Sequence, residues 1–172
     1  MPAGTTLETM LVEGAIDALV SVVLPDSLGR GVRRLFRDFR TAEAQYYRKT
    51  RIFPIMHTVV LRNAVFERHP WLAISLYKAF CEARDLAYRW LYDTDALAVG
   101  LPWVIDDVEI SRELFGPQIW DYSVEGSRPT LEALTAYLHE QGLTRRKVDV
   151  SELFAPNVRA DLADYLRGTG ED

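Results

Sequence analysis

Residues 51–90, RIFPIMHTVVLRNAVFERHPWLAISLYKAFCEARDLAYRW, carry the strongest structural signals in the chain. Pro54 favours an extended conformation in the residue before it, and the run at residues 55–61 is apolar except for His57 and Thr58. This pattern predicts a buried strand. It also places a side chain that titrates near neutral pH within an apolar strand. We therefore look first for a functional site at His57.

The second half of this stretch predicts the longest helix. Residues 63–69 favour a short helical segment, and Pro70 suits the first position of a new helix. Apolar residues then recur at steps of three and four, which is typical of a helix of about twenty residues with one core face. These residues are Leu72, Leu76, Ala79, Phe80, Ala83, Leu86, Ala87 and Trp90. Cys81 falls among them and is expected to be an unreactive core residue.

On the N-terminal side, a helix over residues 6–13 is expected to end at Gly14, where glycine is favoured after a helix. Residues 15–24 are rich in β-branched side chains and end before Pro25, so they predict a second buried strand. Residues 32–49 interleave arginines with aromatic residues. Because the spacing in their second half is helical, an amphipathic helix is favoured over a nucleic-acid-binding surface.

On the C-terminal side, Asp106 and Glu109 have the spacing of a capping box, and Gly116 is expected to end the helix that they begin. The further expected elements are a helix that opens at residues 127–129 and ends at Gly142, a short extended piece at residues 148–154 and a helix at residues 157–166. The chain is thus predicted to be α/β and helix-rich with few strands. Two strands are fewer than a free-standing doubly wound sheet usually contains.

Length and composition restrict the class of protein. A chain of 172 residues with 48% hydrophobic and 26% charged residues forms one domain, or a large piece of a two-lobed one. The net charge of -5 argues against a general nucleic-acid-binding protein, and one cysteine excludes an internal disulfide. The sequence contains neither a secretory signal pattern nor an apolar run of about 20 residues, so we expect a cytoplasmic protein without a membrane segment.

No phosphate-binding loop, zinc-protease motif, nucleophile elbow or paired-cysteine motif is present, so the site candidates are single residues. His57 suits general acid–base chemistry or substrate binding, and the alternative is a hydrogen-bonded core histidine. Arg128 stands at an expected helix start, where backbone N–H groups also attract anions, although a surface arginine is the more common case at such a position. Trp103, Trp120 and Tyr122 lie in loops, where aromatic residues line ligand pockets or pack the loop itself.

The segments IFPIMHTVVLR and ERHPWLAISLYKAF resemble the 4,5-dihydroxyphthalate decarboxylase family. The similarity extends in order through GAIDAL, LPW, TLEAL, HEQGL and ELFAP. This family has the two-lobed fold of periplasmic binding proteins of the second type, and it holds its ligand between the lobes. The resemblance implies that the chain is the C-terminal half of such a protein. Residues 1–50 would end the second lobe, and residues 51–172 would form the crossover and the returning part of the first lobe with the C-terminal helices.

The resemblance also implies an activity, namely a lyase that decarboxylates 4,5-dihydroxyphthalate to protocatechuate during the degradation of aromatic compounds such as phthalates. On this basis His57 is the expected catalytic acid or substrate ligand, and Arg128, Tyr122, Trp103 and Met56 are the expected substrate-binding residues. No organic cofactor is expected, no residue is assigned as a metal ligand, and the metal requirement is left open. The expected partners are a small aromatic carboxylate and either a second copy of the chain or a complementing N-terminal half.

Two departures from the family pattern leave the specific substrate open. Residues 122–128 read YSVEGSR where a family-like sequence is YGxxxNR, and residues 20–27 lack the family's arginine before its proline loop. A non-catalytic solute-binding or ligand-sensing protein and an inactive fragment are therefore alternatives on the same scaffold, because a fold alone does not define an activity.

Overall fold

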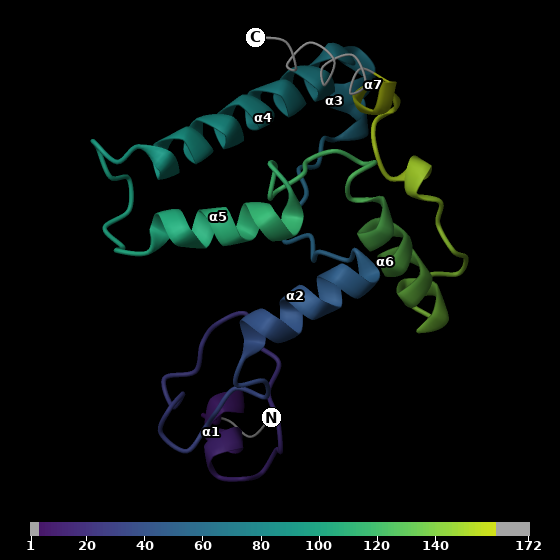
Figure 1. Ribbon diagram of the computed structural model, residues 1–172. Coiled ribbons are helices and arrows are strands. Elements are labelled where there is room, and N and C mark those ends of the chain that lie inside the picture. The colour runs from purple at the N-terminus through teal and green to yellow at the C-terminus, as the bar shows by residue number, and fades with distance from the viewer. Residues whose placement is uncertain (1–3, 161–172) are drawn as a thin grey trace. The chain divides into compact units, whose positions relative to one another are not determined.

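The computed structural model describes residues 4–160, which form a helix-rich structure (Figure 1). The chain divides into two compact units, Met1–Gln45 and Tyr46–Asp172. Over residues 4–160 the β structure is confined to an isolated bridge between Leu28 and Val32. None of the helices in this range combines the length with the apolar character that a bilayer crossing requires.

The first unit contains α1 (Leu7–Val12), which confirms the helix expected near the N-terminus. The Thr6 side chain caps this helix by accepting a hydrogen bond of 3.0 Å from the backbone N–H of Thr9. The Glu8 carboxylate accepts a hydrogen bond of 2.7 Å from the backbone N–H of Ser27, and its side-chain and backbone contacts with Ser27 together lower the pKa of Glu8. A single side chain thus ties α1 to the following loop.

The second unit is built around α4 (Trp71–Tyr92), and α2 (Phe39–Thr50) begins in the first unit and ends in the second. In this unit α4 packs against α3, α5 and α7, and α6 packs against η1 (Figure 1). A small buried apolar cluster of Val124, Leu131 and Val150 lies beside α6, with Phe154 packed on it. The helices are α2 (Phe39–Thr50), α3 (Asn63–Arg68), α4 (Trp71–Tyr92), α5 (Val104–Phe115), α6 (Arg128–Glu140), the 3-10 helix η1 (Val150–Glu152) and α7 (Pro156–Ala160).

Most of the predicted helix ends are confirmed. Pro70 precedes the first residue of α4, and Gly116 ends α5 with a φ of 100° that favours glycine. Gly142 follows α6 with a φ of 72°. The predicted capping box at Asp106 is wrong, because α5 begins earlier with Trp103 at its N-cap. Asp106 lies in the first turn instead, where its carboxylate interacts favourably with the positive end of the helix dipole.

The extended piece expected at residues 148–154 is also wrong, since these residues contain η1. The Asp149 side chain accepts a hydrogen bond of 2.7 Å from the Ser151 backbone, and the Glu152 carboxylate accepts one of 3.1 Å from the Asp149 backbone. This capping box stabilises the tight turn against an extended conformation. Of the helix predicted at residues 157–166, the first residues lie in α7 and the rest lie outside the described range.

The two predicted strands are not formed. Residues 15–24 and 55–61 are irregular, and their apolar side chains face solvent, with Val20 101% and Val60 84% exposed. A strand is stable only when a neighbouring strand pairs with its N–H and C=O groups. Residues 4–160 supply no such neighbour to either segment. The helix-rich character of the predicted fold is confirmed, whereas its α/β sheet is not observed.

The buried face of α4 also differs from the predicted apolar stripe. Its buried residues are Ala73, Cys81 and Arg84, whereas Phe80 and Trp90 are 46% and 55% exposed. The apolar spacing predicted the helix correctly but did not identify the face that the rest of the second unit covers. Cys81, at 1% exposed, is a core residue as expected.

Candidate functional site

The five residues predicted to form a site lie in different parts of the second unit. Met56 and His57 lie in the irregular segment that follows α2, and both side chains are exposed. Trp103 is 72% exposed at the start of α5, and Tyr122 and Arg128 lie just before and at the start of α6. Within residues 4–160 no hydrogen bond, ion pair or ring contact joins any two of the five.

A pair of hydrogen bonds nevertheless brings the His57 segment to the start of α6. The backbone N–H of Phe53 donates to the Thr130 hydroxyl oxygen at 3.0 Å, and this hydroxyl donates to the Phe53 carbonyl at 3.1 Å. Thr130 lies two positions after Arg128, and Phe53 lies four positions before His57. The segment that carries the histidine is therefore anchored close to the helix end that carries the arginine.

Arg128 is engaged by neighbouring carboxylates. Its guanidinium donates two hydrogen bonds to Glu125, at 2.9 Å and 2.6 Å, and approaches Glu132 at 3.7 Å. The bond to Glu125 raises the pKa of Arg128 and lowers that of the glutamate. A ligand carboxylate would have to displace Glu125 from the Arg128 guanidinium. The hollow next to Arg128 has a volume of about 130 Å³, which is smaller than the roughly 300 Å³ typical of ligand pockets.

Arg84 is a buried polar residue that connects α4 to the loop before α6. Its buried side chain donates to Asp85 at 2.9 Å and to the Trp120 carbonyl at 3.1 Å. Its guanidinium also lies 5.0 Å from the centre of the Tyr122 ring. Desolvation lowers the pKa of Arg84, but the hydrogen bond and ion pair with Asp85 outweigh this effect and raise it.

The loop that Arg84 holds is tightly turned. The Asp121 carboxylate accepts a hydrogen bond of 2.7 Å from the Ser123 backbone, and the Ser123 hydroxyl accepts one of 2.9 Å from the Gly126 backbone. A side chain at Gly126 would overlap the Asp121 carboxylate. A larger residue here would therefore force the Asp121 side chain to shift. These contacts give Tyr122 a defined position on the surface.

Aromatic rings from three segments pack together next to this loop. The Phe53 ring lies 4.5 Å from that of Phe115 and 4.7 Å from that of Trp120, and Tyr47 lies 4.7 Å from Phe115. Ring separations in this range are favourable for tilted aromatic pairs. The cluster holds the segment after α2, the end of α5 and the loop before α6 in one arrangement. Trp120 therefore packs the loop, one of the two roles expected for it.

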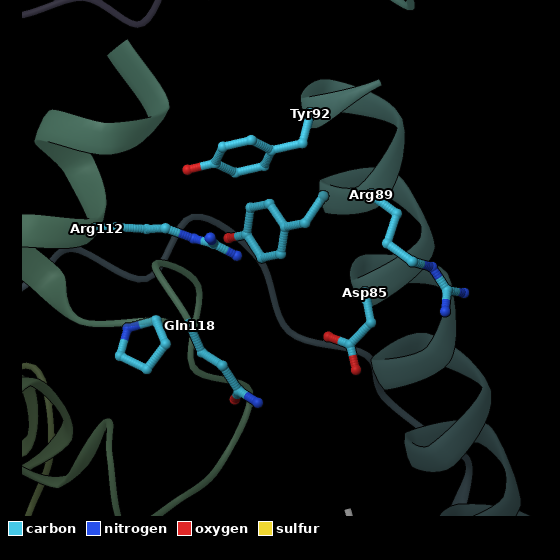
Figure 2. A pocket seen from close by; sticks show the side chains of 7 residues that line it. Asp85, Arg89, Tyr92, Arg112 and Gln118 are labelled. Carbon is cyan, nitrogen blue, oxygen red and sulfur yellow. The ribbon is translucent and has the colours of Figure 1, made fainter. Parts of the chain in front are cut away.

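Sequence reasoning missed a second group of polar residues, which line a hollow between α4, α5 and residues 117–118 (Figure 2). We call it the α4–α5 hollow; it has a volume of about 290 Å³. The Tyr88 hydroxyl accepts a hydrogen bond of 3.0 Å from the Trp120 backbone, and burial raises the pKa of Tyr88. The Arg112 guanidinium lies 4.6 Å from the centre of the Tyr92 ring.

A helical pattern in the sequence would have revealed part of this group. Tyr77, Cys81, Arg84 and Tyr88 follow one another at steps of four, three and four, so they share one face of α4. An arginine on a face with a cysteine and two tyrosines indicates a buried polar contact. Arg112 has no comparable signal, because α5 carries charged residues on several sides.

No group of three or more histidine, cysteine, aspartate or glutamate side chains suited to a metal ion occurs within residues 4–160. The site therefore offers arginine forks, tyrosine hydroxyls, a histidine and aromatic surfaces. These groups recognise anionic and aromatic ligands, because a guanidinium matches a carboxylate and a ring packs on a ring.

Comparison with known proteins shows to which protein the chain is related. No family model matches it. It is similar to the 4,5-dihydroxyphthalate decarboxylase of Comamonas testosteroni, with 35% identity over 158 residues. The match covers 90% of this chain and 48% of that protein, so the chain spans about half the length of this curated relative. The resemblance in the sequence motifs is confirmed: the chain is a homologue of 4,5-dihydroxyphthalate decarboxylase over about half of that enzyme's length.

Proposed function

We propose that this chain contributes to a decarboxylase, a carbon–carbon lyase that removes one carboxylate from a hydroxylated aromatic dicarboxylate. The observation that carries the proposal is the 35% identity to 4,5-dihydroxyphthalate decarboxylase across 90% of the chain. For that substrate, the product would be protocatechuate and CO2. A ring hydroxyl para to the leaving carboxylate supplies electrons, a proton adds to the ring carbon, and the carbon–carbon bond then breaks to release CO2. The proton replaces the carboxylate on the ring.

The protein has to supply a proton donor, a cation for the substrate dianion and an aromatic surface that excludes water. We assign the proton donor to His57 and a carboxylate contact to Arg128. Support comes from the reciprocal hydrogen bonds between Phe53 and Thr130, which anchor the His57 segment next to the start of α6. The exposed His57 ring is accessible to a ligand. Tyr122, Trp103 and Met56 are proposed as further substrate contacts.

We further propose that the chain corresponds to the C-terminal half of a two-lobed protein of the periplasmic-binding-protein type. Residues 1–50 would belong to one lobe, and residues 51–172 would form the crossover and part of the other. The match to 48% of the relative supports a chain of about half the length of such a protein. So do the two β-branched segments, because each has the composition of a strand without a pairing strand among residues 4–160.

Release of CO2 from 4,5-dihydroxyphthalate tests the proposal. The chain is assayed alone and after co-expression with the portion of the Comamonas protein that it does not match. Release by either sample that is lost in His57→Ala, but retained in the matched control His69→Ala, is the expected result. Binding of the substrate without CO2 release would favour a ligand-sensing protein instead. The absence of both from both samples would refute the proposed function.

A further inference from the structure

The α4–α5 hollow is lined by groups that the proposed mechanism does not use. Its volume of about 290 Å³ is at the small end of the range for ligand pockets, roughly 300–1,000 Å³, and is suited to a molecule with one ring. The rings of Tyr88 and Tyr92 and the side chain of Pro117 supply apolar surface. Polar groups come from α4, α5 and Gln118 (Figure 2).

Two arginines line this hollow, and of these Arg112 is the one that stacks on a ring of the lining. Its guanidinium lies over the Tyr92 ring at 4.6 Å, and Figure 2 shows the side chain reaching from α5 toward that tyrosine. Within the described part of the chain, Arg112 has no hydrogen bond or ion pair that occupies its N–H groups. A stacked guanidinium with open N–H groups along its edge is arranged to bind a carboxylate through two parallel hydrogen bonds.

Asp85 supplies an acceptor in the same hollow. Its Oδ1 atom receives both contacts from Arg84, at 2.9 Å and 2.8 Å. Its Oδ2 atom accepts no hydrogen bond from any residue in the range 4–160. No ion pair joins Asp85 to Arg112 in this range, so the two groups border the hollow without neutralising each other. Figure 2 shows that Arg89, in contrast, extends away from Arg112.

We infer that the α4–α5 hollow binds a hydroxylated aromatic monocarboxylate or dicarboxylate, with its carboxylate on Arg112, its ring against the tyrosines and a ring hydroxyl donating to Asp85. The ligand class follows from the lining: the hollow offers a cation at one place, an acceptor at another and aromatic surface between them. The site contains neither His57 nor Arg128 and is separate from the proposed catalytic residues. The inference rests on the proposed function only in supposing that such ligands are the ones the protein meets.

Calorimetric titration of the whole chain tests this inference with three probes. Protocatechuate carries both recognised groups, benzoate lacks the hydroxyls and catechol lacks the carboxylate. We expect protocatechuate to bind more tightly than either of the others. Arg112→Gln should weaken binding of protocatechuate and benzoate about tenfold or more, the loss expected for a charged, paired hydrogen bond, and leave catechol unchanged. The comparison variant is Arg89→Gln, at the second arginine that lines the hollow, whose guanidinium extends away from Arg112.

The Asp85 contact is tested through the ligands, because Asp85→Asn would also remove the ion partner of the buried Arg84 and risk unfolding. Equal affinity for benzoate and protocatechuate would refute the role of Asp85. Absence of binding by all three probes, or equal effects of Arg89→Gln and Arg112→Gln, would refute the site.

The CO2 assay keeps this inference distinct from the proposed function. Binding that depends on Arg112 without any decarboxylation would overturn the function and leave the site. Decarboxylation together with binding that is insensitive to Arg112→Gln would overturn the site and leave the function.

Discussion

Replacing Arg84 with methionine should destabilise the second unit and release the loop before α6. Methionine keeps the apolar length of the side chain but removes the charged donor to the Trp120 carbonyl, a bond of 3.1 Å. Losing a hydrogen bond from a charged group costs about 1.5–3 kcal/mol, and losing the cation–π contact with Tyr122 costs about 0.5–1 kcal/mol. The ion pair with Asp85 adds little, because the Asp85 side chain is 43% exposed.

These losses are partly offset, because burying a cation such as arginine costs desolvation free energy and burying methionine does not. The expected net destabilisation is therefore about 2 kcal/mol, or a fall of about 4–8 °C in the melting temperature for a chain of this size. Urea denaturation followed by circular dichroism measures it. Arg89→Met is the matched control on the same helix, since Arg89 is exposed. Amide hydrogen exchange across residues 120–126 should also accelerate. Equal stability of the two variants, with unchanged exchange in the loop, would refute the role assigned to Arg84.

Three further outcomes are expected. Thr130→Val should remove both hydrogen bonds to Phe53, lower the free energy of unfolding by about 1–2 kcal/mol and speed exchange of the Phe53 amide, whereas Thr130→Ser should not. The bond to Arg146 lowers the pKa of Glu152 from 4.5 to about 2. The pair therefore stabilises the fold fully above pH 4.5, and this stabilisation is lost as the pH falls toward 2. A carboxyl titration by NMR should show this low midpoint in the native chain and a higher midpoint, still below 4.5, in Arg146→Gln, because the hydrogen bond from the Asp149 backbone remains. Cys81 is 1% exposed, so a thiol reagent should label it rapidly in denaturant only, and rapid labelling of the native protein would contradict its burial.

The helices were predictable because their signals are local. Pro70 marks a helix start because its φ is fixed, and Gly116 and Gly142 mark helix ends because glycine adopts a positive φ without steric cost. Both effects act without the rest of the chain. The failures also have local causes. Asp106 has the right spacing for a capping box, but Trp103 occupies the N-cap position. Spacing alone does not show which of two neighbouring turns begins a helix.

The candidate site was predictable in part. Tyr122 was singled out as a loop aromatic, and the structure shows it held by Arg84 from α4. Arg112 was not foreseen, because nothing in the sequence around it shows that it stacks on Tyr92 in a neighbouring helix. The roles of His57 and Arg128 in binding or catalysis remain predictions, and the hydrogen bonds between Phe53 and Thr130 anchor their segments near each other.

The sequence by itself determined the helix-rich class, the main helix boundaries and the relationship to 4,5-dihydroxyphthalate decarboxylase. These depend on short-range backbone preferences and on residue identity. The tertiary structure alone decided which face of α4 is buried and that residues 15–24 and 55–61 remain unpaired. The physical reason is the same in both cases. A buried arginine needs an acceptor and a strand needs a neighbouring strand, and each partner comes from a different part of the chain or is missing from residues 4–160.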